Sequence, residues 1–137
     1  MQNLVKPAYS IIKIVCLITV FSISMTWESC QKAGLDGQNT LVLKPQHHGL
    51  AIKGAVAYIK FNESELPDTS ASAFDHVVKG NNDEDHIHIE NLKRGKYYVY
   101  CVGFDSAIND KVRGGIPVVI NSKSGETEKE VPVTESH

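Results

Sequence analysis

Apolar and polar side chains alternate in short stretches from residue 39 onward, and turn-forming residues separate these stretches. Side chains that alternate with a period of two lie on opposite faces of a β-strand. The pattern predicts a first strand that carries Leu41 and Leu43 and ends near Pro45. Further strands are predicted over residues 55–61, 74–78, 116–120 and 126–133, and two more within residues 86–105. About six or seven strands without a helix of ordinary length favour an all-β sandwich of two sheets.

The second half of the stretch 86–105 is apolar on both faces. After a turn at residues 93–96, one face comprises Tyr97, Val99 and Cys101, and the other comprises Tyr98, Tyr100, Val102 and Phe104. Two apolar faces are typical of a strand in the centre of a sheet. We expect the first face to lie in the core. The second is larger than a solvated face requires, so Tyr98, Tyr100 and Phe104 are a candidate surface for an envelope protein or a glycan. The alternative, which we favour, is that the sandwich's other strands cover it.

Two local features limit the arrangement of these strands. Pro132 cannot donate a hydrogen bond to a neighbouring strand, so the last predicted strand belongs at a sheet edge or ends there. The polar loop over residues 62–75 is long for a β-domain. It is either a functional loop or a crossing between the two sheets.

The first 29 residues have a different composition. Lys6 and Lys13 precede or interrupt an apolar stretch, and residues 14–25 form a 12-residue apolar run. Such a run suits the hydrophobic region of a secretory signal peptide and is short for a membrane span. An uncleaved anchor is the alternative. An ordinary signal peptidase could also cut after Ser24, which would give a soluble exported domain.

The segment Trp-Glu-Ser-Cys at residues 27–30 resembles a lipobox, the signal at which bacterial lipoproteins are cut before a cysteine that then carries acyl chains. The resemblance implies a signal peptide over residues 1–29, a lipid on Cys30 and a location at the bacterial outer membrane. The polar residues 31–39 are then a flexible tether, residues 40–134 the folded domain and residues 135–137 a tail. Cys101 would have no partner for an internal disulfide, because Cys16 is removed.

The stretches IKGAVAYIKF and HIHIENLKRGKYYVY resemble the prealbumin-like sandwiches called carboxypeptidase regulatory-like domains. Leu92, Gly95 and Tyr97 match the corner motif of that family, and residues 122–131 look like its closing hairpin. The resemblance implies a Greek-key sandwich and supplies no common catalytic residues. In the corner, Gly95 would permit a positive φ, and Leu92 and Tyr97 would anchor both ends of the turn in the core.

The histidines of one strand are the main candidates for chemistry. His86 and His88 are two residues apart and therefore face the same side, where they could share a metal ion. A zinc site needs a further ligand, for which the candidates are His47, His48, Asp83 and Asp85. Without one, the pair is the polar face of a half-buried strand. Cys101 is a potential nucleophile, but its position on the predicted core face favours a buried structural residue.

Together these patterns favour a lipid-anchored, non-catalytic binding or assembly module of the cell envelope. A net charge of −2 without a cluster of Lys and Arg gives no indication of a nucleic-acid partner. We expect no cofactor apart from the covalent lipid. The main alternative is a metal-binding periplasmic protein, or a metalloenzyme, that uses His86 and His88.

Overall fold

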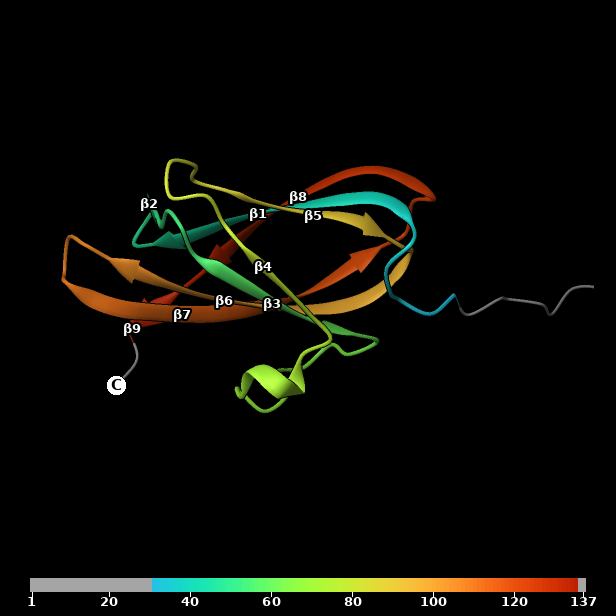
Figure 1. Ribbon diagram of the computed structural model, residues 1–137, viewed down its shortest axis with the longest axis horizontal. Coiled ribbons are helices and arrows are strands. Elements are labelled where there is room, and N and C mark those ends of the chain that lie inside the picture. Colours follow the sequence, from blue (N-terminus) through green and yellow to red (C-terminus); the bar gives the residue numbers. More distant parts are fainter. Residues whose placement is uncertain (1–30, 136–137) are drawn as a thin grey trace, which may run out of the picture. The chain divides into compact units, whose positions relative to one another are not determined.

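Nine strands form two sheets in the computed structural model, which describes residues 31–135 (Figure 1). The first sheet contains β1 (Gln38–His47), β2 (Leu50–Ala51), β5 (Ile87–Leu92) and β8 (Ser124–Pro132). The second contains β3 (Val56–Phe61), β4 (His76–Lys79), β6 (Gly95–Asp105), β7 (Asp110–Ile120) and β9 (Thr134–Glu135). The only helix in this part of the chain is a 3₁₀ turn, Ala71–Ala73. The predicted all-β, two-sheet fold is confirmed. Residues 31–135 contain no helix that is long and apolar enough to cross a membrane.

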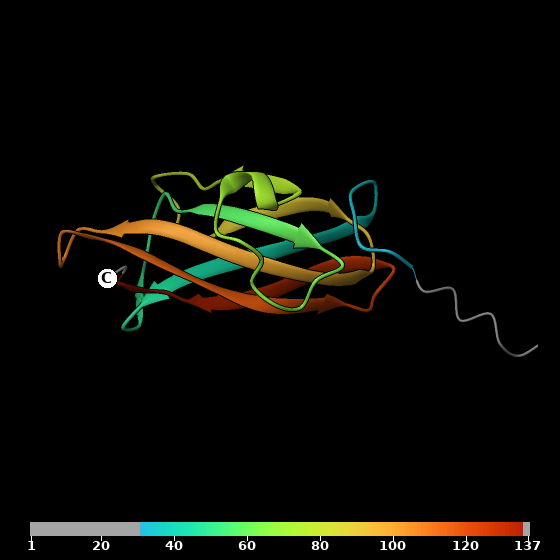
Figure 2. The same ribbon diagram turned by 90° about the horizontal axis from the view of Figure 1, so that it is seen from below.

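The two sheets lie one above the other in Figure 1, and Figure 2 looks onto the second sheet with the first behind it. In the first, β1 is central: it pairs in antiparallel fashion with β5 and β2, and in parallel fashion with β8. In the second, the order β4-β3-β6-β7-β9 is antiparallel throughout, and β6 is the middle strand, as its two apolar faces predict. Pro132 ends β8, which pairs only with β1 and is therefore an edge strand. Both expectations for Pro132 are confirmed.

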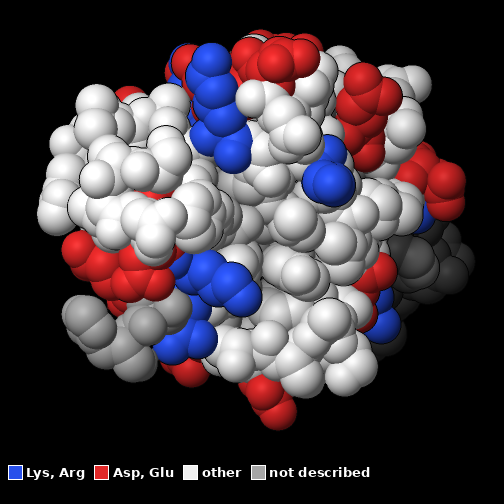
Figure 3. All heavy atoms as spheres, turned by 60° about the vertical axis from the view of Figure 1, so that its left-hand side comes forward, with Lys and Arg blue, Asp and Glu red and all other residues white. Residues whose placement is uncertain are grey.

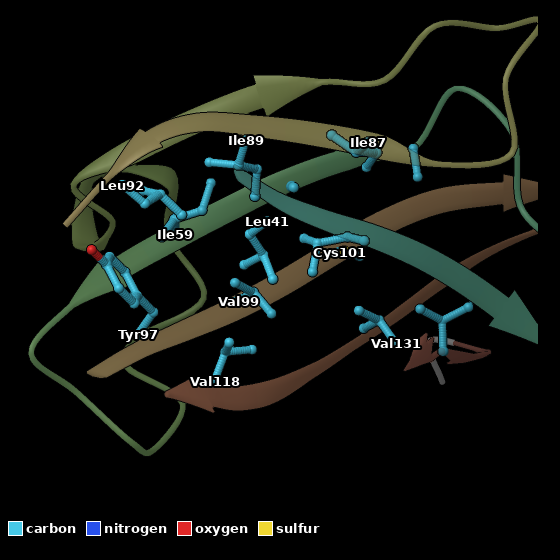
Figure 4. Close-up of a cluster of buried hydrophobic side chains, with 14 of the residues drawn as sticks. Leu41, Ile59, Ile87, Ile89, Leu92, Tyr97, Val99, Cys101, Val118 and Val131 are labelled. Atoms are coloured by element: carbon cyan, nitrogen blue, oxygen red, sulfur yellow. The ribbon is translucent and has the colours of Figure 1, made fainter. Parts of the chain in front are cut away.

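The core lies between the sheets and is built from alternate residues of their strands. Figure 4 shows these side chains converging from both sheets. The fully buried members include Leu41, Leu43, Ala57, Ile59, Ile89, Leu92, Tyr97, Val99, Cys101 and Val131. Each buried Leu, Ile or Val contributes about 1.5–3 kcal/mol relative to an exposed one. The predicted inward faces are therefore correct, and Leu92 and Tyr97 anchor the turn at Gly95, whose φ is 152°.

Two strand limits differ from the prediction by two residues. β1 continues past Pro45 to His47. The carbonyl oxygen of Pro45 accepts a hydrogen bond from the Ile52 amide at 2.9 Å, so the missing N–H of Pro45 would face the same side. On that side, pairing with β5 has ended and pairing with β2 has not begun, so the proline removes no ladder bond. The predicted strand at residues 74–78 begins later, at His76.

The predicted closing hairpin at residues 122–131 is also wrong, because β7 and β8 belong to different sheets. Buried Asn39 holds the connection between them: its Nδ2 lies 3.2 and 3.3 Å from the carbonyl oxygens of Ser122 and Lys123. The Ser122 hydroxyl donates to Asn39 Oδ1 at 2.9 Å. β8 thus runs beside β1, and the chain returns to the second sheet at buried Val133 to form β9.

The prediction of a flexible tether over residues 31–39 is wrong. β1 begins at Gln38, and Ala33 is buried. The Ala33 amide donates to Asn62 Oδ1 at 2.8 Å, and the Gly34 amide donates to the Tyr97 hydroxyl at 3.1 Å. Residues 33–37 therefore belong to the folded domain, which also extends beyond the predicted limit at residue 134 into β9.

Candidate functional site

The aromatic face of β6 is covered along most of its length. Tyr98 and Tyr100 are buried, in a cluster with Phe74. Phe74 stacks on Tyr100 with ring centroids 6.0 Å apart and an angle of 12° between the ring planes, and it contacts Tyr58 at 5.4 Å. Phe74 follows directly after the 3₁₀ turn of the long polar loop. Tyr98 and Tyr100 are therefore covered, as the favoured alternative predicts, and the loop, rather than another strand, supplies much of the cover.

Two parts of this face stay open to a ligand. Phe104 is 52% exposed near the end of β6. A shallow pocket of about 170 Å³ lies beside the cluster, between Thr69 of the loop and the start of β7. An edge of Tyr100 and the side chains of Lys111 and Arg113 line it. This combination of an aromatic edge and two cations suits a small polar or anionic group.

His86 and His88 lie together, as their spacing predicts. Their ring centroids are 4.8 Å apart, and the rings are nearly perpendicular. His86 Nδ1 is hydrogen-bonded to Asp85 Oδ1 at 2.8 Å, which holds the pKa of Asp85 below its usual range. Residues 31–135 do contain three side chains whose ligand atoms lie close enough together to share a metal ion. His86 and His88 are not among them. The pair by itself offers two ligands.

Cys101 is in the core, as its position on the inward face of β6 predicts. Burial raises the pKa of its thiol to about 12. The reactive form of cysteine is the thiolate, which is negligible at neutral pH with such a pKa. Cys101 therefore stabilises the core and does not serve as a nucleophile at neutral pH.

A buried polar group lies where β1, β6 and β9 meet. His47 and Asp105 are both buried, and His47 Nδ1 lies 2.7 Å from Asp105 Oδ2. On the other side of the ring, His47 Nε2 lies 3.5 Å from Glu135 Oε1 and has no hydrogen-bond partner among the described residues. His48 stacks on His47 with ring centroids 4.1 Å apart. The hydrogen bond to Asp105 and the charge of Glu135 raise the pKa of His47.

Sequence patterns identified only part of this group. His47 and His48 were candidates as extra ligands for His86 and His88, whereas Asp105 and Glu135 carried no signal. Asp105 is 58 positions from His47 in the chain, and Glu135 is near its end. No spacing rule connects such distant residues, because the pairing of strands alone brings them together.

The proposed lipidation residue, Cys30, and the signal peptide of residues 1–29 lie outside the described residues, as do residues 136 and 137. The first described residue, Gln31, already contacts the domain: its side chain accepts a hydrogen bond from Arg94 Nε at 2.9 Å. Comparisons of the chain with protein-family models, with curated proteins and with solved structures found no match.

Proposed function

We propose that this chain is an exported lipoprotein of the bacterial cell envelope, anchored through a lipid on Cys30, whose β-sandwich is a non-catalytic binding or assembly module. The observation that carries the proposal is the lipobox-like segment at residues 27–30. Its cysteine is followed directly by Gln31, whose side chain contacts Arg94 of the folded domain. The apolar run at residues 14–25 and the small residue Ser29 before Cys30 support the same cleavage point.

The short connection determines how such an anchor would hold the domain. Only Gln31 and Lys32 stand between Cys30 and buried Ala33. Three residues reach at most about 10 Å, so the lipid would keep this end of the sandwich at the membrane surface. Lys32 and the basic turn at residues 93–96 lie at this end, since the Lys93 amide donates to Gly34. Each cation near an anionic headgroup contributes about 1 kcal/mol.

The opposite end of the sandwich would then face away from the membrane and be available to a partner. Three apolar side chains are exposed there: Leu50 in β2, Phe104 near the end of β6, and Ile108 in the turn between β6 and β7. Figure 3 views the molecule from this side and shows uncharged side chains across part of its centre, with Lys and Arg side chains beside them and most Asp and Glu side chains toward the rim. Exposed apolar side chains with a polar rim are typical of surfaces that bind another protein.

The intact mass of the protein, extracted with detergent from a Gram-negative host, tests the proposal. We expect the mass of residues 30–137 plus acyl groups, and we expect Cys30→Ala to leave the membrane fraction while its circular dichroism stays unchanged. Cys16→Ala is the matched control and should stay lipidated, because residue 16 is in the segment to be removed. A Cys30→Ala protein that remains in the membrane fraction, or a bare chain that begins at Met25, would refute the lipid anchor.

A further inference from the structure

We propose that His47, His48 and Glu135 bind one divalent transition-metal ion of the zinc type, with Asp105 as the residue that orients His47. The proposal concerns the end of the sandwich opposite Gln31 and does not depend on whether Cys30 carries a lipid. It differs from the alternative site at His86 and His88, which lie on one strand, because the ends of β1 and β9 and the turn after β1 bring its ligands together.

The first observation is the convergence of three ligand atoms. One nitrogen from each histidine and one oxygen of Glu135 all lie within 4.8 Å of one another. Neighbouring ligands of a tetrahedral zinc ion are about 3.3 Å apart, given bonds of about 2.0–2.1 Å. His47 Nε2 and Glu135 Oε1, at 3.5 Å, are already close to this separation. The remaining adjustment can come from His48, which is exposed in the turn after β1, and from the half-buried Glu135.

The second observation is the unpartnered nitrogen of His47. The side chain is only 2% exposed, and its Nε2 has no hydrogen-bond partner among the described residues, although buried polar atoms nearly always have one. Asp105 explains its orientation. The Asp105 carboxylate accepts a hydrogen bond from Nδ1–H of His47 at 2.7 Å and is itself held by the Ala107 amide at 2.8 Å. In the neutral ring, Nε2 therefore carries the free lone pair, with Glu135 Oε1 3.5 Å away, which is the tautomer that carboxylates impose on metal-binding histidines.

The ligand set indicates which metal fits. Two imidazole nitrogens and one carboxylate oxygen suit Zn²⁺ and leave a fourth position for water or another group. Ca²⁺ and Mg²⁺ need six or more oxygen ligands or an octahedral shell, which a set with two histidines does not provide.

Titration calorimetry with ZnCl₂ at pH 8, on the full-length protein in detergent and without an added histidine tag, tests the proposal. We expect one ion per chain with a dissociation constant in the micromolar range or below. Co²⁺ should give the visible absorption of a tetrahedral site and be displaced by Zn²⁺. His48→Ala and Glu135→Gln should each weaken binding at least about tenfold, and Asp105→Asn by about 10–100-fold. We avoid His47→Ala because it removes a buried side chain.

The double variant His86→Ala, His88→Ala is the matched control, since it removes two histidines that also contact each other but lie on β5. It should bind Zn²⁺ as the unmodified protein does. The proposal is wrong if no heat is observed at 100 µM ZnCl₂, if Glu135→Gln and His48→Ala bind unchanged, or if only the control variant loses binding. In the first case the group is an ion-pair network of Asp105, protonated His47 and Glu135. In the last, the metal site is the one on β5.

Discussion

The hydroxyl group of Tyr97 is one of the groups that connect the start of the domain to its core. The ring is fully buried and meets Phe61 edge-on, with centroids 5.8 Å apart. The hydroxyl accepts a hydrogen bond from the Gly34 amide at 3.1 Å and lies 2.6 Å from the carbonyl oxygen of Lys93, to which it donates. Tyr97→Phe removes both bonds and keeps the ring in place. The substitution therefore separates the contribution of the hydroxyl group to the attachment of residues 33–37 from the packing of the core.

The expected magnitude follows from these two bonds. A hydrogen bond between uncharged groups contributes about 1 kcal/mol net, so the loss of two should lower the free energy of unfolding by about 2 kcal/mol. In a domain of about 100 residues, 1 kcal/mol corresponds to about 4–8 °C in Tm, so Tm should fall by about 8–16 °C. Gly34 is only half-buried, so water can reach its amide once the hydroxyl is absent. The loss in the free energy of unfolding should therefore not exceed about 2 kcal/mol.

Urea unfolding followed by circular dichroism measures the stability, and hydrogen exchange at the Gly34 amide measures the local attachment. Tyr98→Phe is the matched control: it is the next residue of β6 and is also buried, and its hydroxyl has no hydrogen bond to any described residue. We expect a change of less than about 0.5 kcal/mol for the control. Equal losses in the two variants, or unchanged exchange at Gly34 in Tyr97→Phe, would refute the reasoning.

Two further predictions concern the thiol in the core and the glycine of the corner. Between pH 9 and 12 the thiol of Cys101 ionises in the unfolded chain but not in the folded chain, where its pKa is about 12. The free energy of unfolding should therefore fall by about 1.4 kcal/mol per pH unit relative to that of Cys101→Ala. Parallel pH profiles of the two proteins in denaturant titrations would contradict this, as would iodoacetamide labelling of Cys101 in the native protein at pH 7.5. Gly95→Ala places a Cβ 2.7 Å from the backbone of Ala33 at a φ of 152°, whereas Gly125→Ala at a φ of 132° meets open space. Backbone strain should lower the free energy of unfolding by about 1–3 kcal/mol in both variants. Gly95→Ala should lower it further, because of the contact with Ala33, and should speed proteolysis before residue 38. Equal thermal stabilities of the two variants would contradict the contact with Ala33.

Most of the strands and their inward faces could be predicted from local patterns. Ala57 and Ile59 of β3, and Val99 and Cys101 of β6, are buried because each strand encodes its own face by alternation. The face of a strand does not reveal its neighbour. The parallel pairing of β8 with β1 was missed for this reason, since Asn39 and its bonds to residues 122 and 123 join segments more than 80 positions apart. The alternation of side chains in β8 would be the same whether the strand paired with β7 or with β1.

The candidate sites divide in the same way. The sequence by itself determined that His86 and His88 share a face, that Cys101 is in the core and that β6 has a second aromatic face, because these are properties of single strands. Only the tertiary structure decided that a loop covers Tyr98 and Tyr100, that residues 33–37 are attached to Tyr97, and that His47, Asp105 and Glu135 meet. Each of these depends on contacts between segments far apart in the chain, and such contacts arise only when the packing of both sheets brings the segments together.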